Sequence, residues 1–180
     1  MFRRLLLPLV AIAALVALPK PASAQYFYGS YGSGSGAYLP MYGGYILAPR
    51  APRATVDRRM DPRLLKAARI AEANASPHST MRCWRFVKVA LLKAGAVCGY
   101  PKTNFACEAG GELTSRYGFV RLPIYDPYRA PLGSVLVYSG GGIGGAGHVE
   151  IRTAHGFASD YRSPWHCRYR LIGVYAKFSA

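Results

Sequence analysis

The sequence predicts an α+β domain in which N-terminal helices pack on an antiparallel sheet. Apolar residues recur at helical spacing between residues 62 and 94, whereas period-two alternation takes over from residue 134. Helices that come first and strands that follow as neighbours are typical of this fold class. A chain of 180 residues, once processed segments are set aside, is expected to form one such domain.

The first 24 residues have the features of a secretory signal peptide. Arg3 and Arg4 precede an apolar run over residues 5–18, and Ala22-Ser23-Ala24 forms a small-x-small cleavage site. The run is too short to span a bilayer, and no second apolar run follows it. We therefore expect a secreted or periplasmic protein with no membrane span.

Residues 25–59 are rich in Gly, Tyr, Ser and Pro. Such a composition buries too little apolar surface to offset its backbone entropy, so a flexible segment is expected here. The folded domain then covers residues 60–180, and limited proteolysis is expected to leave a fragment that begins near Asp57.

The first helix of the domain has a clear start signal. Asp61 is expected as its N-cap, with Pro62 at its first position and its end near Asn74. A short helical piece is expected further on, over residues 112–117.

The second helix, within residues 79–95, carries a cysteine in its first turn. Ser79 or Thr80 is expected as its N-cap and Gly95 as its left-handed C-cap. Cys83 lies on the apolar face, and the positive end of the helix and two flanking arginines favour its thiolate. On this helix alone, a small buried cysteine is the simpler interpretation.

Strands are expected over residues 119–122, 134–138, 148–153, 156–161 and 170–177, the last four as an antiparallel meander.

The hairpin formed by the third and fourth of these strands decides which polar side chains can meet. His148, Glu150 and Arg152 share one face of their strand, and the apolar residues between them face the core. A three-residue loop, 153–155, places His148 opposite Asp160, whereas a two-residue loop would turn Asp160 to the other face. With the first option, a cysteine, a histidine and an orienting carboxylate make up the machinery of nucleophilic acyl chemistry.

The charge of the chain points to an anionic partner. Removing Arg3, Arg4 and Lys20 from the 23 basic residues leaves 20 against 8 acidic ones, a net charge of +12. We expect attraction to peptidoglycan or another anionic envelope polymer. The basic residues are scattered and no nucleic-acid module is visible, so nucleic acid is not an expected partner, and a monomer is expected.

The four cysteines, Cys83, Cys98, Cys107 and Cys167, all lie within the expected domain. Export permits disulfides, and four cysteines allow three complete pairings. Cys98 and Cys107 bracket a short loop and are the expected pair. No two cysteines have metal-site spacing, and His166-Cys167 alone is too little for zinc, so no metal and no organic cofactor are implied.

Three motifs in a fixed order resemble a known family. Cys83-Trp84 opens a helix, Ala130-Pro131-Leu132-Gly133 leads into the strand ending at Tyr138, and Gly147-His148-Val149-Glu150-Ile151 opens the next strand. This arrangement resembles the NlpC/P60 and CHAP superfamily of papain-like cell-wall hydrolases, over residues 60–180.

The resemblance implies a Cys–His–Asp triad that cleaves an amide in peptidoglycan. Cys83 would be the nucleophile, His148 the general base and Asp160 the orienting residue. The residues expected near the substrate, two of them second choices for the orienting role, are Trp84, Glu150 and Ser159. The chain departs from the family in having Ser134 where an aspartate is usual, and in its long glycine-rich segment 140–147.

Two other functions remain open on the sequence. One is a non-catalytic envelope-binding protein on the same fold, with Cys83 locked in a disulfide, most plausibly with Cys167. The other is a secreted effector or a different acyl-transfer enzyme that uses the same Cys–His machinery. The state of the Cys83 thiol separates the enzyme from the binding protein.

Overall fold

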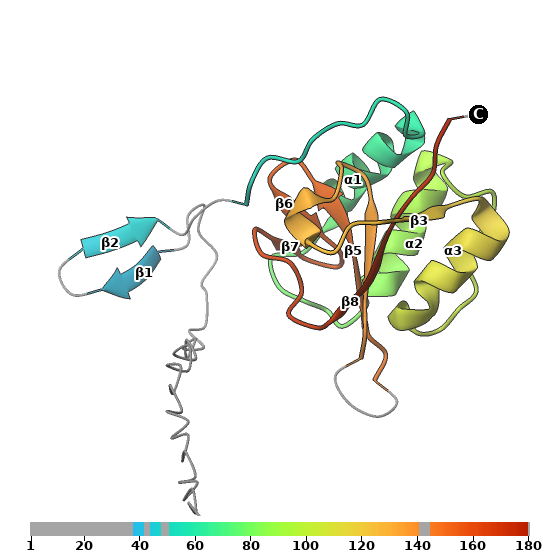
Figure 1. The fold of residues 1–180 in the computed structure, drawn as a ribbon. Helices are drawn as coiled ribbons and strands as arrows, with labels where there is room; N and C mark the ends of the chain where they lie inside the picture. Colours follow the sequence, from blue (N-terminus) through green and yellow to red (C-terminus); the bar gives the residue numbers. More distant parts are fainter. Residues whose placement is uncertain (1–37, 42–43, 48–50, 141–144, 180) are drawn as a thin grey trace, which may run out of the picture. The chain divides into compact units, whose positions relative to one another are not determined.

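The computed structural model describes residues 38–41, 44–47, 51–140 and 145–179, and the signal-peptide prediction lies outside them. The helices are α1 (Pro62–Asn74), α2 (Cys83–Ala94) and α3 (Ala109–Tyr117), with 3-10 turns η1 (Ala106–Glu108) and η2 (Pro127–Arg129). The strands are β1 (Tyr38–Met41), β2 (Gly44–Leu47), β3 (Val120–Leu122), β4 (Val135–Tyr138), β5 (His148–Thr153), β6 (Gly156–Ala158), β7 (Arg162–Ser163) and β8 (Leu171–Ala176). The α+β class is confirmed (Figure 1).

The sheet of the domain has six antiparallel strands in the order β3-β8-β4-β5-β6-β7. The expected meander is wrong for the last strand. Strand β8 does not follow on from its predecessor in the sheet but pairs with β4 on one side and with β3 on the other. Strand β4 is thereby central, with β5 on one side and β8 on the other.

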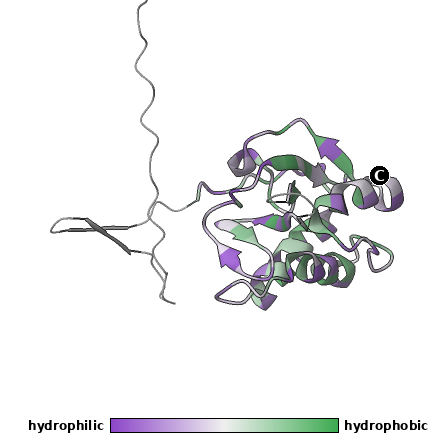
Figure 2. Cartoon of the chain, turned by 90° about the horizontal axis from the view of Figure 1, so that it is seen from below, coloured by the Kyte–Doolittle hydropathy of each residue, from purple (hydrophilic) through white to green (hydrophobic). Residues whose placement is uncertain are grey.

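Both faces of the sheet are covered. The three helices pack on one face, over a core that includes Val135, Val137, Val149 and Ile151. On the other face a smaller cluster contains Leu136, Tyr138, Phe157 and Val174. Hydrophobic residues accordingly lie on the sides of helices and strands that are turned toward one another (Figure 2).

The polar face of β5 is buried rather than solvated. Arg152 is 0% exposed, and its guanidinium donates to the carbonyls of Thr153, Gly156 and Pro52. Its charge also lies 4.8 Å from the centre of the Phe157 ring. Alternation of polar and apolar residues usually marks a half-exposed strand, so this second buried layer could not be predicted from the pattern of β5.

The β5–β6 hairpin has the shorter of the two loops considered from the sequence. Thr153 pairs with Gly156 and Ile151 with Ala158, so only two residues connect the strands. The expected three-residue loop, and with it the placement of His148 opposite Asp160, is wrong. Gly156 fits this turn because a Cβ there would lie 2.3 Å from the Ser163 carbonyl oxygen.

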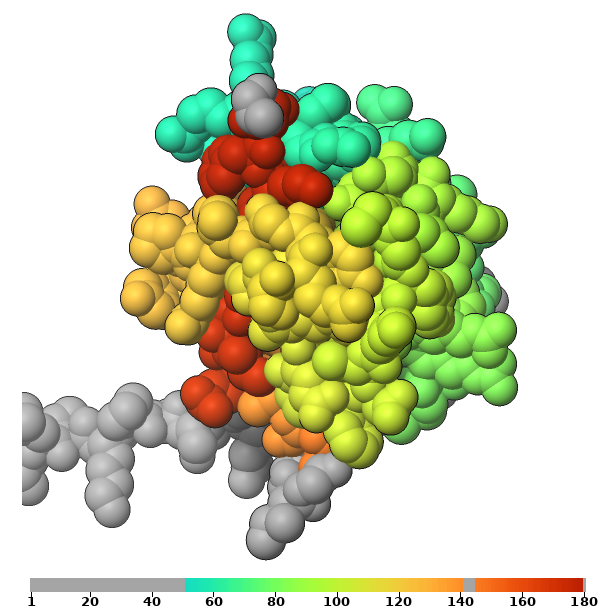
Figure 3. Space-filling view, turned by 90° about the vertical axis from the view of Figure 1, so that its right-hand side faces the viewer, coloured from blue at the N-terminus to red at the C-terminus, as the bar shows by residue number. Residues whose placement is uncertain are grey.

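The segment before the domain is more structured than its composition predicts. Strands β1 and β2 pair in antiparallel fashion, with Tyr38 opposite Leu47. Residues 51–59, expected to be flexible, contact the domain: the N–H of Ala54 donates to the Ala154 carbonyl. The C-terminal residues also lie beside the start of the domain, as the Met60–Phe178 bridge records (Figure 3).

We therefore expect the stable fragment to begin near Ala51 rather than near Asp57. Removing residues 51–56 takes away the Pro52 carbonyl from buried Arg152 and the Thr55 carbonyl from the Leu132 N–H. Unsatisfied buried donors of this kind should lower the free energy of unfolding by about 2 kcal/mol or more. Denaturant melts of chains starting at residues 51 and 57 measure the difference, and equal midpoints would contradict this account.

Among the described residues, no helix has the length and hydropathy needed to cross a membrane.

Candidate active site

Cys83 is the first residue of α2, and its side chain is half-buried. The expected caps, Ser79 and Thr80, are wrong: Arg82 is the N-cap and its side chain makes no cap hydrogen bond. Gly95 ends the helix in the left-handed conformation, with φ of 79°, as predicted. The groups that order the start of this helix come from elsewhere in the chain.

Asp160 supplies that order. Its Oδ2 accepts hydrogen bonds from the N–H groups of Thr80 and Arg82 at 2.6 and 3.2 Å, and from the Ser79 hydroxyl at 3.0 Å. Burial alone would raise the pKa of Asp160, but these donors outweigh it and lower the pKa below its ordinary value. Asp160 thus fixes the loop before the cysteine and does not pair with His148, contrary to the sequence prediction.

The loop that Asp160 holds is strained at one residue. Met81 has φ of 60°, in the left-handed region that residues with a side chain rarely adopt, and it is 91% exposed. Such strain persists where the surrounding contacts fix the backbone. Here the bonds from Thr80 and Arg82 to one carboxylate oxygen fix it on both sides of Met81.

His148 is the first residue of β5. It follows Gly147, at a position that only glycine can occupy. Gly147 has φ of +74°, and a Cβ there would lie 2.5 Å from the Tyr138 carbonyl oxygen and 2.8 Å from the Cys107 Cβ. The N–H of Cys107 also donates to the Ala146 carbonyl. These contacts fix the strand where the histidine emerges.

The carboxylate partner of His148 is Glu150, two residues along the same strand. Nε2 of His148 lies 3.4 Å from Oε2 of Glu150, and both side chains are nearly buried. Among the described residues Nε2 has no partner in hydrogen-bonding geometry, so this contact is an ion pair. With Nε2 facing the carboxylate, Nδ1 is the ring nitrogen left for the Cys83 thiol.

The cysteine and the glutamate together change the charge state of the histidine. Burial lowers the pKa of His148, but its contacts with the Cys83 thiol and the Glu150 carboxylate outweigh burial and raise the pKa to about 9. At neutral pH the ring is therefore an imidazolium between a thiol group and a carboxylate. This arrangement favours the thiolate–imidazolium pair used by cysteine nucleophiles.

Two further groups hold Glu150, and the sequence did not reveal either. The Tyr138 hydroxyl donates to Oε1 at 2.6 Å, and the Cys167 N–H donates to the same oxygen at 3.3 Å. Burial and the neighbouring carboxylate raise the pKa of Tyr138 far above its ordinary value, so the hydroxyl is always a donor. Tyr138 of β4 lies opposite His148 of β5. This register could not be predicted from the sequence, because no short turn connects the two strands.

The other residues expected near a substrate are not available to one. Trp84 is 4% exposed, and its indole N–H donates to Thr103. Ser159 is 2% exposed and donates to Oδ1 of Asp160. Both side chains stabilise the region around α2. Their expected role as substrate contacts is therefore wrong.

All four cysteines are unbonded in the structure, so the predicted Cys98–Cys107 disulfide is wrong. Cys98 is exposed after α2. Cys107 instead lies against the segment before His148, with its Sγ 3.9 Å from the Gly145 carbonyl. Cys83 is likewise free, which removes the structural basis for a disulfide-locked binding protein.

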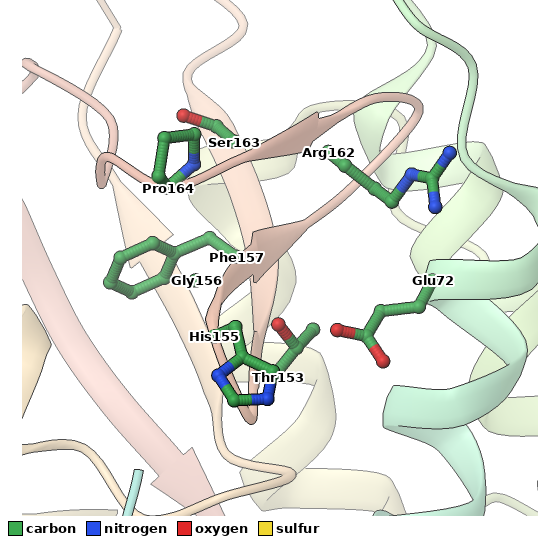
Figure 4. Close-up of a pocket in the computed structure, with 8 residues that line it drawn as sticks. All are labelled: Glu72, Thr153, His155, Gly156, Phe157, Arg162, Ser163 and Pro164. Atoms are coloured by element: carbon green, nitrogen blue, oxygen red, sulfur yellow. The ribbon is translucent and has the colours of Figure 1, made fainter. Parts of the chain in front are cut away.

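A pocket of about 230 Å³ in the described part of the chain lies at the β5–β6 hairpin. Thr153, His155, Arg162 and Glu72 of α1 line its rim at the turn of the β5–β6 hairpin (Figure 4). None of its lining residues belongs to the Cys83–His148–Glu150 group. Within the described part of the chain, no group of three His, Cys, Asp or Glu side chains is arranged to hold a metal ion.

Comparisons with known proteins give a likeness of fold only. One crystal structure of the type VI native effector–immunity complex Tae3–Tai3 from Ralstonia pickettii has a chain that matches with a TM-score of 0.51 and 20% identity. The match covers 64% of this chain and 98% of that one. The selenomethionine form of the same complex gives a TM-score of 0.45 and 26% identity over 54% and 80% of the two chains.

No protein-family model matches the chain, and no curated protein does. The assignment to the NlpC/P60 and CHAP superfamily is wrong, because the solved structure that shares the fold is a chain of the Tae3–Tai3 complex. The three motifs that suggested it are local features, and the fold that carries them is shared with a chain of the Tae3–Tai3 complex instead.

Proposed function

We propose that this protein is a cysteine hydrolase that cleaves an amide bond in peptidoglycan. Cys83 is the nucleophile, His148 the general acid and base, and Glu150 the carboxylate that orients and charges the histidine. The observation that carries the proposal is the buried His148–Glu150 pair, with Nε2 3.4 Å from Oε2, together with a cysteine at the first position of α2. The raised pKa of His148, for which its contacts with Cys83 and Glu150 outweigh burial, supports it. Asp160, first expected in the orienting role, acts as a positioning residue for the nucleophile loop.

The reaction follows from these charges. The Cys83 thiolate attacks the amide carbonyl carbon, and the carbon–nitrogen bond breaks as the leaving amine takes a proton from His148. A thioester remains on Cys83. Neutral His148 then removes a proton from water as the water oxygen attacks the thioester carbon. The carbon–sulfur bond breaks, the carboxylic acid product leaves, and Cys83 thiolate and His148 imidazolium are restored.

The helix start offers a donor for the oxyanion. The first N–H groups of a helix have no partner within it, and that of Cys83 lies beside the reacting sulfur. A developing negative charge on the carbonyl oxygen is stabilised there by the N–H group and by the positive end of α2.

Three features support peptidoglycan as the substrate. The leader over residues 1–24 directs the chain to the secreted or periplasmic location where the wall lies. The net charge of +12 that remains without the three basic residues of the leader favours an anionic polymer. The fold likeness to a chain of an effector–immunity complex adds a second candidate, an effector with the same chemistry that acts on the wall of another cell.

Digestion of purified peptidoglycan, followed by mass analysis of the products, tests the proposal. We expect new amine and carboxylate ends with the wild-type chain and none with Cys83→Ala. If Cys83→Ala released the same products in the same amounts as the wild type, Cys83 would not be the nucleophile. The effector candidate would be favoured if the protein releases fragments from the immobilised wall of a neighbouring strain while the wall of the producing strain resists cleavage.

A further inference from the structure

The direction of the His148 ring is not set by a hydrogen bond at Nε2. That atom lies 3.4 Å from Oε2 of Glu150, but among the described residues it has no partner in hydrogen-bonding geometry. An ion pair depends mainly on distance, whereas a hydrogen bond also requires alignment. The rotation of the ring, which decides whether Nδ1 faces the Cys83 thiol, therefore depends on the side chains packed against it.

Two tyrosine rings pack against His148 from opposite sides of β5. The centre of the Tyr138 ring lies 6.1 Å from that of the imidazole, with 42° between the two planes. The Tyr161 ring lies 6.2 Å away, at 47°. Tyr138 belongs to β4 and Tyr161 to the connection between β6 and β7, and β5 lies between β4 and β6 in the sheet. The imidazole thus has an aromatic neighbour on each side, at a distance where such rings attract one another.

The two tyrosines make different further contacts. Tyr138 is fully buried, and its hydroxyl donates to Glu150. Tyr161 is half-buried, and within the described part of the chain its hydroxyl has no hydrogen-bond partner. The contact of Tyr161 with His148 is therefore made by the ring alone. Since the side chain of His148 is only 12% exposed, this ring covers the imidazole on the side away from β4.

The backbone of Tyr161 is tied to the segment that positions the nucleophile. Its carbonyl accepts from the Ser159 N–H at 2.9 Å, and the residue forms a parallel bridge with Ser76, which lies ahead of the Cys83 loop. The preceding residue, Asp160, holds that loop through its carboxylate. These contacts of Tyr161 use backbone atoms, so replacing its side chain leaves them in place.

The ring of Tyr161 stays neutral over the pH range in which His148 is charged. Burial raises the pKa of Tyr161 to about 12, and the charges of four groups around it act in the same direction: Glu150, Cys167, Asp160 and Cys83. Tyr161 is therefore a neutral cover over a charged pair, and it neither adds a charge to the site nor takes a proton from it.

We propose that Tyr161 is a positioning residue that holds the His148 ring in place and keeps water away from its contact with Glu150; this inference rests on the proposed function. Charges attract one another more strongly where water is excluded. A ring that is packed on both sides is also kept from turning Nδ1 away from Cys83. The thiolate–imidazolium pair depends on both conditions, so Tyr161 acts through His148 and does not itself touch the reacting atoms.

The rate at which iodoacetamide modifies Cys83, followed by peptide mass analysis at a series of pH values, tests this role. Each rate is divided by that of the same chain in alkaline solution, so that a change in access to the thiol cancels. We expect Tyr161→Ala to slow the reaction about tenfold in mildly acidic solution, where the thiolate depends on the imidazolium. Tyr161→Phe retains the ring and should react like the wild type. Tyr125→Ala, which removes an 82% exposed ring between β3 and η2, is the control and should also do so.

Titration of the His148 ring gives a second readout. Without the ring of Tyr161, water reaches the imidazole, and its pKa should fall from about 9 toward the ordinary value of 6.5. Thermal melts show whether each variant keeps its fold. Tyr161→Leu, which fills part of the space without an aromatic ring, replaces Tyr161→Ala if that chain does not fold.

Two results would overturn the proposal. One is an unchanged alkylation profile in folded Tyr161→Ala or Tyr161→Leu. The other is an equal loss in Tyr161→Phe, which would assign the effect to the hydroxyl instead of the ring. Neither assay contains peptidoglycan, so the role of Tyr161 is decided even if the wild-type chain releases nothing from the wall, and the two failures are distinguishable.

Discussion

Glu150→Gln is expected to lower the rate of peptidoglycan cleavage by at least about 100-fold, the scale of a lost general acid or base. The substitution keeps the shape of the side chain, and the amide oxygen can still accept from Tyr138 at the position of Oε1. It removes the negative charge that lies 3.4 Å from Nε2 of His148. The imidazolium then loses its stabilising partner, and fewer molecules hold the thiolate–imidazolium pair.

The rate of product release from purified wall, measured beside the rate of iodoacetamide reaction at Cys83, checks this result. Glu72→Gln serves as the matched control, since Glu72 lines the pocket at the β5–β6 turn, which Cys83, His148 and Glu150 do not line. A Glu150→Gln chain with the wild-type rate would show that the carboxylate plays no part in the reaction.

Asp160→Ala is expected to have the largest effect on stability, about 3 kcal/mol or more. It leaves buried donors from Thr80, Arg82 and Ser79 without an acceptor, while the left-handed conformation of Met81 loses its support. Because the folded-state pKa of Asp160 is lowered, its contribution to stability is present above the ordinary carboxyl pKa and is lost as pH falls through the folded value.

Denaturant unfolding at neutral pH and near pH 3 measures this contribution. Asp160→Asn should lose less stability than Asp160→Ala, because its amide oxygen still accepts one of the bonds. The difference between wild type and Asp160→Ala should shrink at the lower pH. An equal difference at both pH values would mean that the charge of Asp160 does not stabilise the loop.

Local signals made the elements of the fold predictable. Asp61 caps α1, which begins at Pro62 and ends at Asn74, and β5 covers the predicted residues 148–153. Capping residues, glycines and period-two alternation act over a few positions, so the sequence contains the information directly. Cys83 and His148 could be selected for the same reason, since each stands at the start of an element.

The partner of His148 could not be predicted because it depended on the length of one turn. A two-residue loop in place of a three-residue loop moves every side chain of β6 to the other face, and Asp160 moves with them. Nothing in residues 153–156 decides between the two. The role that Asp160 does take requires contacts with a loop about 80 residues earlier, which only the packed fold provides.

Titration of the His148 ring by NMR tests the central claim most directly, with His148→Gln used to assign its resonance among the four histidines. The raised pKa means that the stabilising charge is fully present below about pH 6.5 and is lost as pH rises through about 9. We predict a pKa of about 9 in the wild type, a fall in Glu150→Gln and no comparable fall in Asp160→Asn. A wild-type pKa at or below 6.5, or one that Glu150→Gln leaves unchanged, would contradict the Cys83–His148–Glu150 assignment.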